Sequence, residues 1–124
     1  MLVVPGGAQV PWFVTPLCVG SGIALVAAGL PLARRRVPPN ALYGVRLPST
    51  MRDEEAWYEV NERAGRDLIA IGAGFLLCYL AAHWLGAGWD PAVRVLVPVV
   101  LLVAALVVET VVIFRAAERA ARRR

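Results

Sequence analysis

The stretch VTPLCVGSGIALVAAGLPL (residues 14–32) carries no charged side chain over 19 consecutive positions. A helix needs about 20 mostly apolar residues to cross the roughly 30 Å hydrocarbon core of a bilayer. Two later runs are similar: residues 68–85 lack charge apart from the titratable His83, and residues 95–114 contain one charge, Glu109. The sequence therefore predicts a single all-α integral membrane domain. Its three transmembrane helices are expected at residues 14–32, 68–85 and 92–114.

Two other interpretations of the apolar runs are less well supported. Buried helices of soluble bundles rarely run this long without a polar face. A cleaved signal peptide has a basic segment before its apolar run. Here no basic residue precedes Val14, and three arginines follow the run, at Arg34, Arg35 and Arg36. We therefore expect the first run to remain as a membrane span.

The basic residues, which number 13 and are all arginine, predict the orientation of the chain. Seven lie within residues 34–66, five lie within residues 115–124, and only Arg94 lies elsewhere. The positive-inside rule then places the loop 33–67 and the basic C-terminal tail 115–124 in the cytoplasm, and the N-terminus outside. Three tryptophans would gather at the outer interface as an aromatic belt: Trp12, Trp84 and Trp89.

Other classes of function find little support in the sequence. A single histidine, His83, with Cys18 and Cys78 inside spans, has no metal-ligand spacing, and we expect no metal or other cofactor. The two cysteines suit small buried positions in membrane helices, with a disulfide on the outer side as the alternative. No catalytic arrangement or phosphate-binding loop is evident, so we expect no enzyme. The net charge of +4 reflects topology rather than direct nucleic-acid binding.

The segment between the first two runs is the only one with varied polar chemistry. Thr50 precedes Asp53 by three residues, as in a capping box, and residues 53–66 follow a helical pattern. We expect this helix to be amphipathic and to lie at the inner interface, anchored by Trp57, with Gly65 as the bend into the second span. Its predicted ion pairs at i,i+4 spacing are Glu59–Arg63 and Glu62–Arg66.

Small residues recur at every fourth position in the first two spans. Such stripes allow helices to approach closely in lipid, and we expect these two to face each other or the third helix. The positions are Gly20, Ala24 and Ala28 in the first span, and Ala70, Gly74, Cys78 and Ala82 in the second.

The segment PNALYGVRLPSTMRDEEAWYEVNERAG (residues 39–65) resembles the hallmark segment of the SdpI family of bacterial membrane proteins. One span before it and two after it are also similar to the family domain. Leu47 and Met51 depart from the usual Thr and Leu. The resemblance rests on nine positions: Pro39, Asn40, Gly44, Arg46, Thr50, Trp57, Asn61, Arg63 and Gly65.

The resemblance implies a multi-pass protein of the bacterial plasma membrane that acts by binding. Its best-known member confers immunity to a secreted peptide toxin and also holds a transcriptional repressor at the membrane. A role in immunity or in sensing a membrane-active peptide is therefore implied, with signalling through the cytoplasmic loop to a regulatory protein. The alternative is a structural or accessory subunit of a larger membrane complex, with self-association as a further expectation because three helices leave much surface unpaired.

Two polar features are candidates for function. Asn40, Arg46 and Asn61, with Trp57, suit a site for a lipid headgroup, peptide or protein, or else they satisfy one another and fix the shape of the loop. Glu109 is the one charge within a span. It is expected to pair with Arg34 or Arg66, while a proton-coupled or lipid-modifying role with Arg46 is the weaker alternative.

Overall fold

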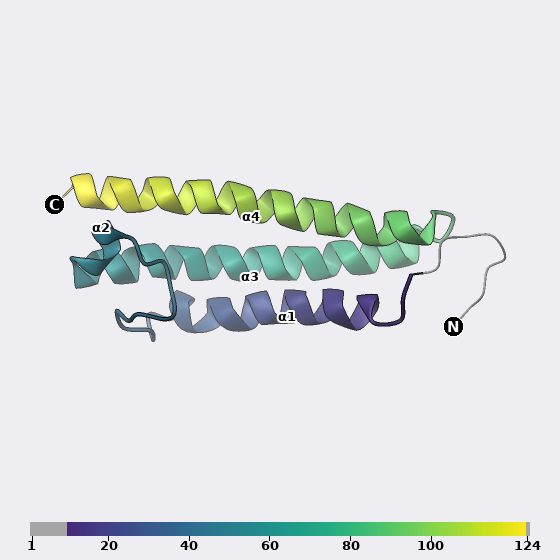
Figure 1. Ribbon diagram of the computed structural model, residues 1–124, viewed down its shortest axis with the longest axis horizontal. Helices are drawn as coiled ribbons and strands as arrows, with labels where there is room; N and C mark the ends of the chain where they lie inside the picture. The colour runs from purple at the N-terminus through teal and green to yellow at the C-terminus, as the bar shows by residue number, and fades with distance from the viewer. Residues whose placement is uncertain (1–9, 124) are drawn as a thin grey trace.

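The computed structural model describes residues 10–123, and the elements in this part of the chain are all helices. The three long helices lie side by side with α3 in the middle (Figure 1). Each of the three is long and apolar enough to cross a membrane. The predicted all-α membrane protein with three spans is therefore confirmed. The helices are α1 (Val14–Ala33), the single-turn α2 (Pro48–Met51), α3 (Glu54–Leu85) and α4 (Pro91–Arg122).

The predicted interfacial helix is not a separate element. Residues 54–66 form the first turns of α3, which continues over 32 residues to Leu85. Trp57 is fully buried, at 0% exposure, and so does not anchor in headgroups. The predicted interfacial helix is therefore not confirmed: the polar segment continues into the span as one helix, and Trp57 packs under the loop.

Gly65 serves close packing rather than a bend. A Cβ atom at this position would lie 2.4 Å from the backbone nitrogen of Ala33 and 2.6 Å from the carbonyl oxygen of Gly29. Seven residues further on, a Cβ at Gly72 would lie 2.8 Å from the carbonyl oxygen of Gly22. The two pairs of glycines bring the backbones of α1 and α3 together, as small residues do in membrane helices.

The expected stripes of small residues do not form this seam. Gly20 and Gly74 have open space where a Cβ would lie. The α1–α3 seam instead uses the glycines at heptad spacing, 22 and 29 on α1 and 65 and 72 on α3. Cys18 and Cys78 are free thiols.

α4 contacts the rest of the bundle through two apolar clusters near its ends. At the loop end, Ile113 and Ala117 pack against Val60 of α3. At the opposite end, Val95 and Val99 pack on a cluster that contains Phe75 and Tyr79. Asp90 caps the start of the helix, because its carboxylate accepts the N–H of Ala92 at 2.8 Å.

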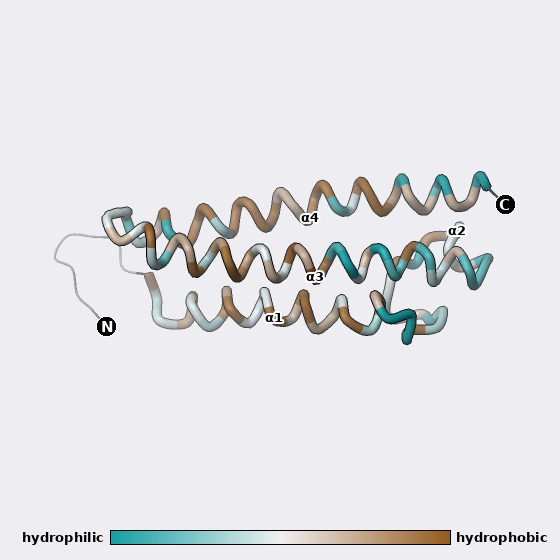
Figure 2. Tube along the Cα trace, turned by 180° about the vertical axis from the view of Figure 1, so that it is seen from behind, coloured by the Kyte–Doolittle hydropathy of each residue, from teal (hydrophilic) through white to brown (hydrophobic). Residues whose placement is uncertain are grey.

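Polar and apolar residues separate along the bundle. The middle of each long helix is apolar, whereas the loop and the adjoining ends of α3 and α4 are hydrophilic (Figure 2). Both the α1–α3 loop and the C-terminus lie at this end, and the α3–α4 turn lies at the other (Figure 1). The predicted belt residues Trp12, Trp84 and Trp89 are exposed, and they belong to the end with the α3–α4 turn.

Candidate functional site

The α1–α3 loop is fastened to α3 by one buried amide. Asn61, which is 2% exposed, accepts the backbone N–H of Val45 through its Oδ1 atom at 2.6 Å. Its Nδ2 atom donates to the carbonyl of Trp57, one helical turn earlier, at 2.9 Å. Both ends of the side chain are thus occupied by backbone groups, and Asn61 joins the loop to the helix.

Gly44 makes that contact possible. Its φ of +113° is rarely adopted by residues with a side chain. A Cβ there would also lie 2.7 Å from Asn61 Oδ1 and 2.9 Å from the ring of Trp57. The indole Nε1 of Trp57 donates to the carbonyl of Val37 at 2.8 Å, so the same tryptophan holds the beginning of the loop.

Asn40 organises the first turn of the loop, directly after Pro39. Its Oδ1 atom accepts the N–H groups of Leu42 and Tyr43 at 2.8 and 2.7 Å. Its amide nitrogen donates to the carbonyls of Pro38 and Tyr43 at 2.9 and 3.0 Å. All of these bonds are local, as in Asx turns, so Asn40 shapes the loop and does not meet Asn61.

Thr50 closes the loop before α3 begins. Its hydroxyl accepts the N–H of Leu47 at 2.9 Å and lies 2.8 Å from the carbonyl of Val45. It therefore fixes the turn of α2 and does not cap α3, which corrects the expected capping box. Asp53 itself caps α3 by accepting the N–H groups of Glu55 and Ala56 at 2.9 and 3.5 Å.

The two arginines of the hallmark segment lie at the surface. Arg46 is exposed and donates to the carbonyl of Ala41 within the loop. Arg63 is exposed on α3 and forms an ion pair with Asp67 at 3.8 Å. The structure therefore does not bring Asn40, Arg46 and Asn61 into one polar site. Most of the hallmark residues hold the loop in shape, and the arginines remain open to a ligand.

An ion-pair network fixes the start of the loop on α3. Arg35 bonds Glu55 at 2.5 Å and approaches Glu62 at 3.6 Å, while its guanidinium lies 5.5 Å from the centre of the Tyr58 ring. The hydrogen bond with Glu55 raises the pKa of Arg35. The predicted Glu62–Arg66 pair is confirmed at 2.5 Å. The predicted Glu59–Arg63 pair is replaced by Arg63–Asp67.

The charge within the third span faces α3. Glu109 and Asp67 line a wide, open cavity of about 390 Å³ on the surface between α4 and α3. The charged groups that interact with Glu109 are Asp67 and, at longer range, Arg63. The Oε1 atom of Glu109 is buried and has no hydrogen-bond partner among residues 10–123. The other lining residues are apolar: Ala70, Ile71, Ala104, Ala105 and Val108.

This arrangement corrects the expected partners of Glu109. Arg66 is engaged by Glu62, and Arg34 does not line the cavity. Arg46 does not line it either, so the proposed association of Arg46 with Glu109 is not formed. Asp67 was not among the predicted site residues. Its position at the border of the second apolar run, level with the inner half of the third, was the available signal.

Together these features define a class: a small α-helical membrane protein with three spans, whose first loop is clamped by asparagine, threonine and tryptophan onto an extension of the second span. The model of the SdpI/YfhL protein family matches residues 36–114, more than half of the chain. The chain belongs to this family, as the resemblance in its loop predicted. No curated protein and no solved structure matches it.

Proposed function

We propose that this member of the SdpI/YfhL family acts by binding rather than by catalysis, and that it confers immunity to, or senses, a membrane-active peptide. The observation that supports this most directly is the cavity between α3 and α4, which lies among the apolar turns of both helices and contains Glu109 and Asp67. Ionisable side chains in membrane spans are rare and usually functional.

The cavity has the chemistry of a helix-docking surface. Ala70, Ala104 and Ala105 are small, and small residues let a second helix approach closely in lipid. The Glu109 carboxyl offers a buried oxygen that lacks a donor among the described residues. An unmade hydrogen bond of this kind costs about 1–3 kcal/mol. A donor or cationic side chain on a bound peptide would recover that energy and give specificity.

The α1–α3 loop offers a surface on which a regulatory partner would bind. Its shape is fixed by buried side chains such as Trp57 and Asn61, while Arg46 faces outward. In the orientation that the positive-inside rule favours, this surface lies in the cytoplasm. A forked guanidinium suits a carboxylate on a protein partner. Peptide binding beside α3 would be communicated to the loop because the same helix carries both.

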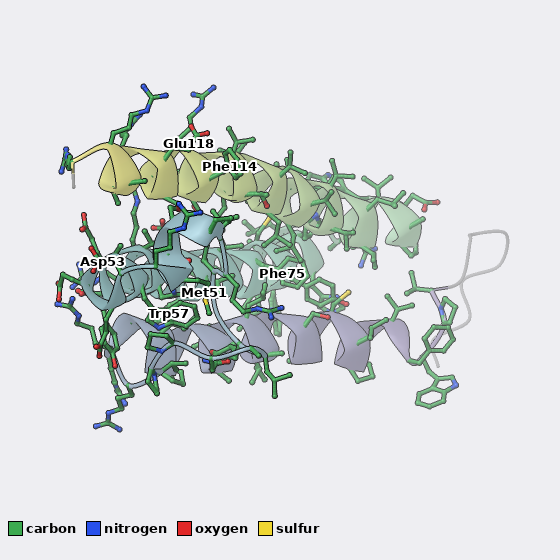
Figure 3. All side chains as sticks on the ribbon, turned by 60° about the vertical axis from the view of Figure 1, so that its left-hand side comes forward. Met51, Asp53, Trp57, Phe75, Phe114 and Glu118 are labelled. Carbon is green, nitrogen blue, oxygen red and sulfur yellow. The ribbon has the colours of Figure 1, made fainter. Side chains whose placement is uncertain are left out.

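A protection assay tests the proposal. Sensitive bacteria that express the chain are exposed to a panel of membrane-active peptides, and survival is compared with that of cells carrying an empty vector. We expect protection against at least one peptide and its loss in Glu109→Gln. Glu118→Gln is the matched control, because Glu118 is exposed and projects from α4 away from α3 (Figure 3). Unchanged killing across the panel would contradict the immunity role.

A second candidate function, as an accessory subunit of a larger membrane complex, is favoured by the exposed side of α4. Exposed apolar residues on this helix follow alternating spacings of four and three, the pattern of a helix-packing seam. Purification in mild detergent separates the two candidates, because a subunit would copurify with a stoichiometric membrane partner and confer no protection. The residues of the pattern are Val93, Val97, Val100, Ala104, Val107, Val111 and Phe114.

A further inference from the structure

A second cleft between α3 and α4, at the end with the loop, is lined by three arginines. It has a volume of about 110 Å³. Arg63 comes from α3, and Arg119 and Arg123 come from the last turns of α4. Ala116 and Ala120 form part of its wall, and their small side chains leave the cleft open between the long arginines.

The charges in this cleft do not balance. Glu59 is the one acidic residue in its lining. Arg63 is partly compensated by Asp67 at 3.8 Å. Neither Arg119 nor Arg123 forms an ion pair with any acidic side chain in the part of the chain that the structure describes. The cleft therefore retains net positive charge after both nearby carboxylates are counted.

The helix dipoles do not cancel this charge. α3 begins and α4 ends on the same side of the bundle (Figure 1). The partial positive charge at a helix N-terminus and the partial negative charge at a helix C-terminus are similar in size. Their opposite signs offset each other at this end, so the guanidinium groups determine the local field.

The cleft is expected at the level of lipid headgroups, because Arg119 lies five residues, or about 8 Å, beyond residue 114, where the predicted third span ends. Along α4, Arg119 lies ten residues beyond Glu109, or about 15 Å at the rise of an α-helix. Residues 63, 67 and 70 share one face of α3 at helical spacing, so the arginine cleft and the apolar cavity open on the same side of the α3–α4 pair. Asp67, which also lines the apolar cavity, would repel an anion from that cavity and favour its retention among the arginines.

We propose that Arg63, Arg119 and Arg123 bind the phosphate of an anionic lipid headgroup, while the acyl chains of that lipid lie along the apolar side of the α3–α4 pair. Guanidinium groups match phosphate oxygens in bidentate geometry. The neighbouring apolar wall at Ala105 and Val108 distinguishes a lipid from a soluble phosphate, which would gain nothing from it. This inference rests on the arginine cleft and does not require the proposed peptide binding, although the acyl chains would contact residues of the apolar cavity.

Native mass spectrometry of the purified full chain in detergent tests the site. The chain is mixed with phosphatidylglycerol, with zwitterionic phosphatidylcholine, or with phosphatidylglycerol in the presence of inorganic phosphate. The double variant Arg119→Gln/Arg123→Gln removes two arginines from the cleft. The double variant Arg115→Gln/Arg122→Gln removes the same charge from α4 at residues that do not line it. Circular dichroism confirms that both variants are folded.

We expect the wild-type chain to retain phosphatidylglycerol in preference to phosphatidylcholine. The cleft variant should lose about tenfold or more of this retention, since it lacks two guanidinium groups that would contact the phosphate. The control should change by less than about twofold, because its two arginines do not line the cleft. Equal losses in the two variants would show that the lipid is retained by general attraction to the basic end of α4, and would overturn the site. Equal retention of both lipids would also overturn it, and displacement by equimolar inorganic phosphate would assign the cleft to a soluble anion.

Discussion

The Oδ1 atom of Asn61 on α3 accepts the backbone N–H of Val45 in the loop at 2.6 Å, across 16 residues of sequence. Asn61 is buried and Val45 is partly buried, so water has little access to the bond. Together with the bond from Asn61 Nδ2 to the carbonyl of Trp57, it makes Asn61 a link between the loop and the helix beneath it, beside the link that Trp57 makes to Val37.

Removing this amide should destabilise the protein and free the loop. Asn61→Ala leaves the N–H of Val45 without its acceptor, which costs about 1–3 kcal/mol in the free energy of unfolding. Asn61→Asp keeps an acceptor for Val45 but loses the donor to Trp57. Its loss in the free energy of unfolding should therefore differ from that of Asn61→Ala and should depend on pH. Unfolding in detergent, followed by circular dichroism, measures both. A wild-type midpoint in Asn61→Ala would contradict the role of the amide.

Substitution of Gly44 should have an effect of similar or greater size. Gly44→Ala places a methyl group 2.7 Å from Asn61 Oδ1 at a φ of +113°. Backbone strain of this kind costs about 1–3 kcal/mol, and displacement of the Asn61 amide adds to it. Limited proteolysis of the loop should show faster cleavage in Gly44→Ala. Protection equal to that of the wild type would show that the loop does not depend on this contact.

A matched pair of glycine substitutions tests the α1–α3 seam. Gly65→Ala puts a Cβ 2.4 Å from the nitrogen of Ala33, so the helices must separate. Gly74→Ala adds a methyl group to open space on the same helix, where alanine is favoured over glycine by about 1 kcal/mol. We expect the thermal midpoint in detergent to fall in the first variant and to stay level or rise in the second. Equal midpoints would contradict backbone contact at Gly65.

Single-cysteine labelling tests the orientation. In a chain with Cys18 and Cys78 replaced by alanine, Leu42→Cys introduces a thiol at a loop position that is 92% exposed. Ala87→Cys introduces one in the exposed α3–α4 turn. With the loop in the cytoplasm, an impermeant maleimide should label Ala87→Cys on intact cells and Leu42→Cys only after permeabilisation. The reverse pattern would place the loop outside.

The number of spans could be predicted from the sequence because hydrophobic transfer dominates in the membrane, and it acts through local composition. The runs at residues 14–32 and 68–85 lie within α1 and α3. The cap at Asp90 is equally local in origin, since its carboxylate lies beside the first free N–H groups of α4. Membership of the family followed from residues close together in the loop.

The remaining features depend on contacts between elements. An amphipathic pattern from 53 to 66 fits a helix on a membrane surface and a helix covered by a loop equally well, and only the burial of Trp57 decides between them. The pairing of Glu109 with Asp67 depends on the register between α3 and α4. The spacing of residues within either helix does not reveal that register, so an arginine was the expected partner of Glu109.

The uninterrupted α3 has a mechanical consequence. Its 32 residues amount to about 48 Å at 1.5 Å per residue, whereas the hydrocarbon core is about 30 Å thick. More than a third of α3 therefore extends beyond the hydrocarbon core, with the loop packed against this part. A small change in the tilt of α3 inside the bilayer would move its protruding end over a larger distance. A movement within the membrane would in this way displace the polar surface at that end.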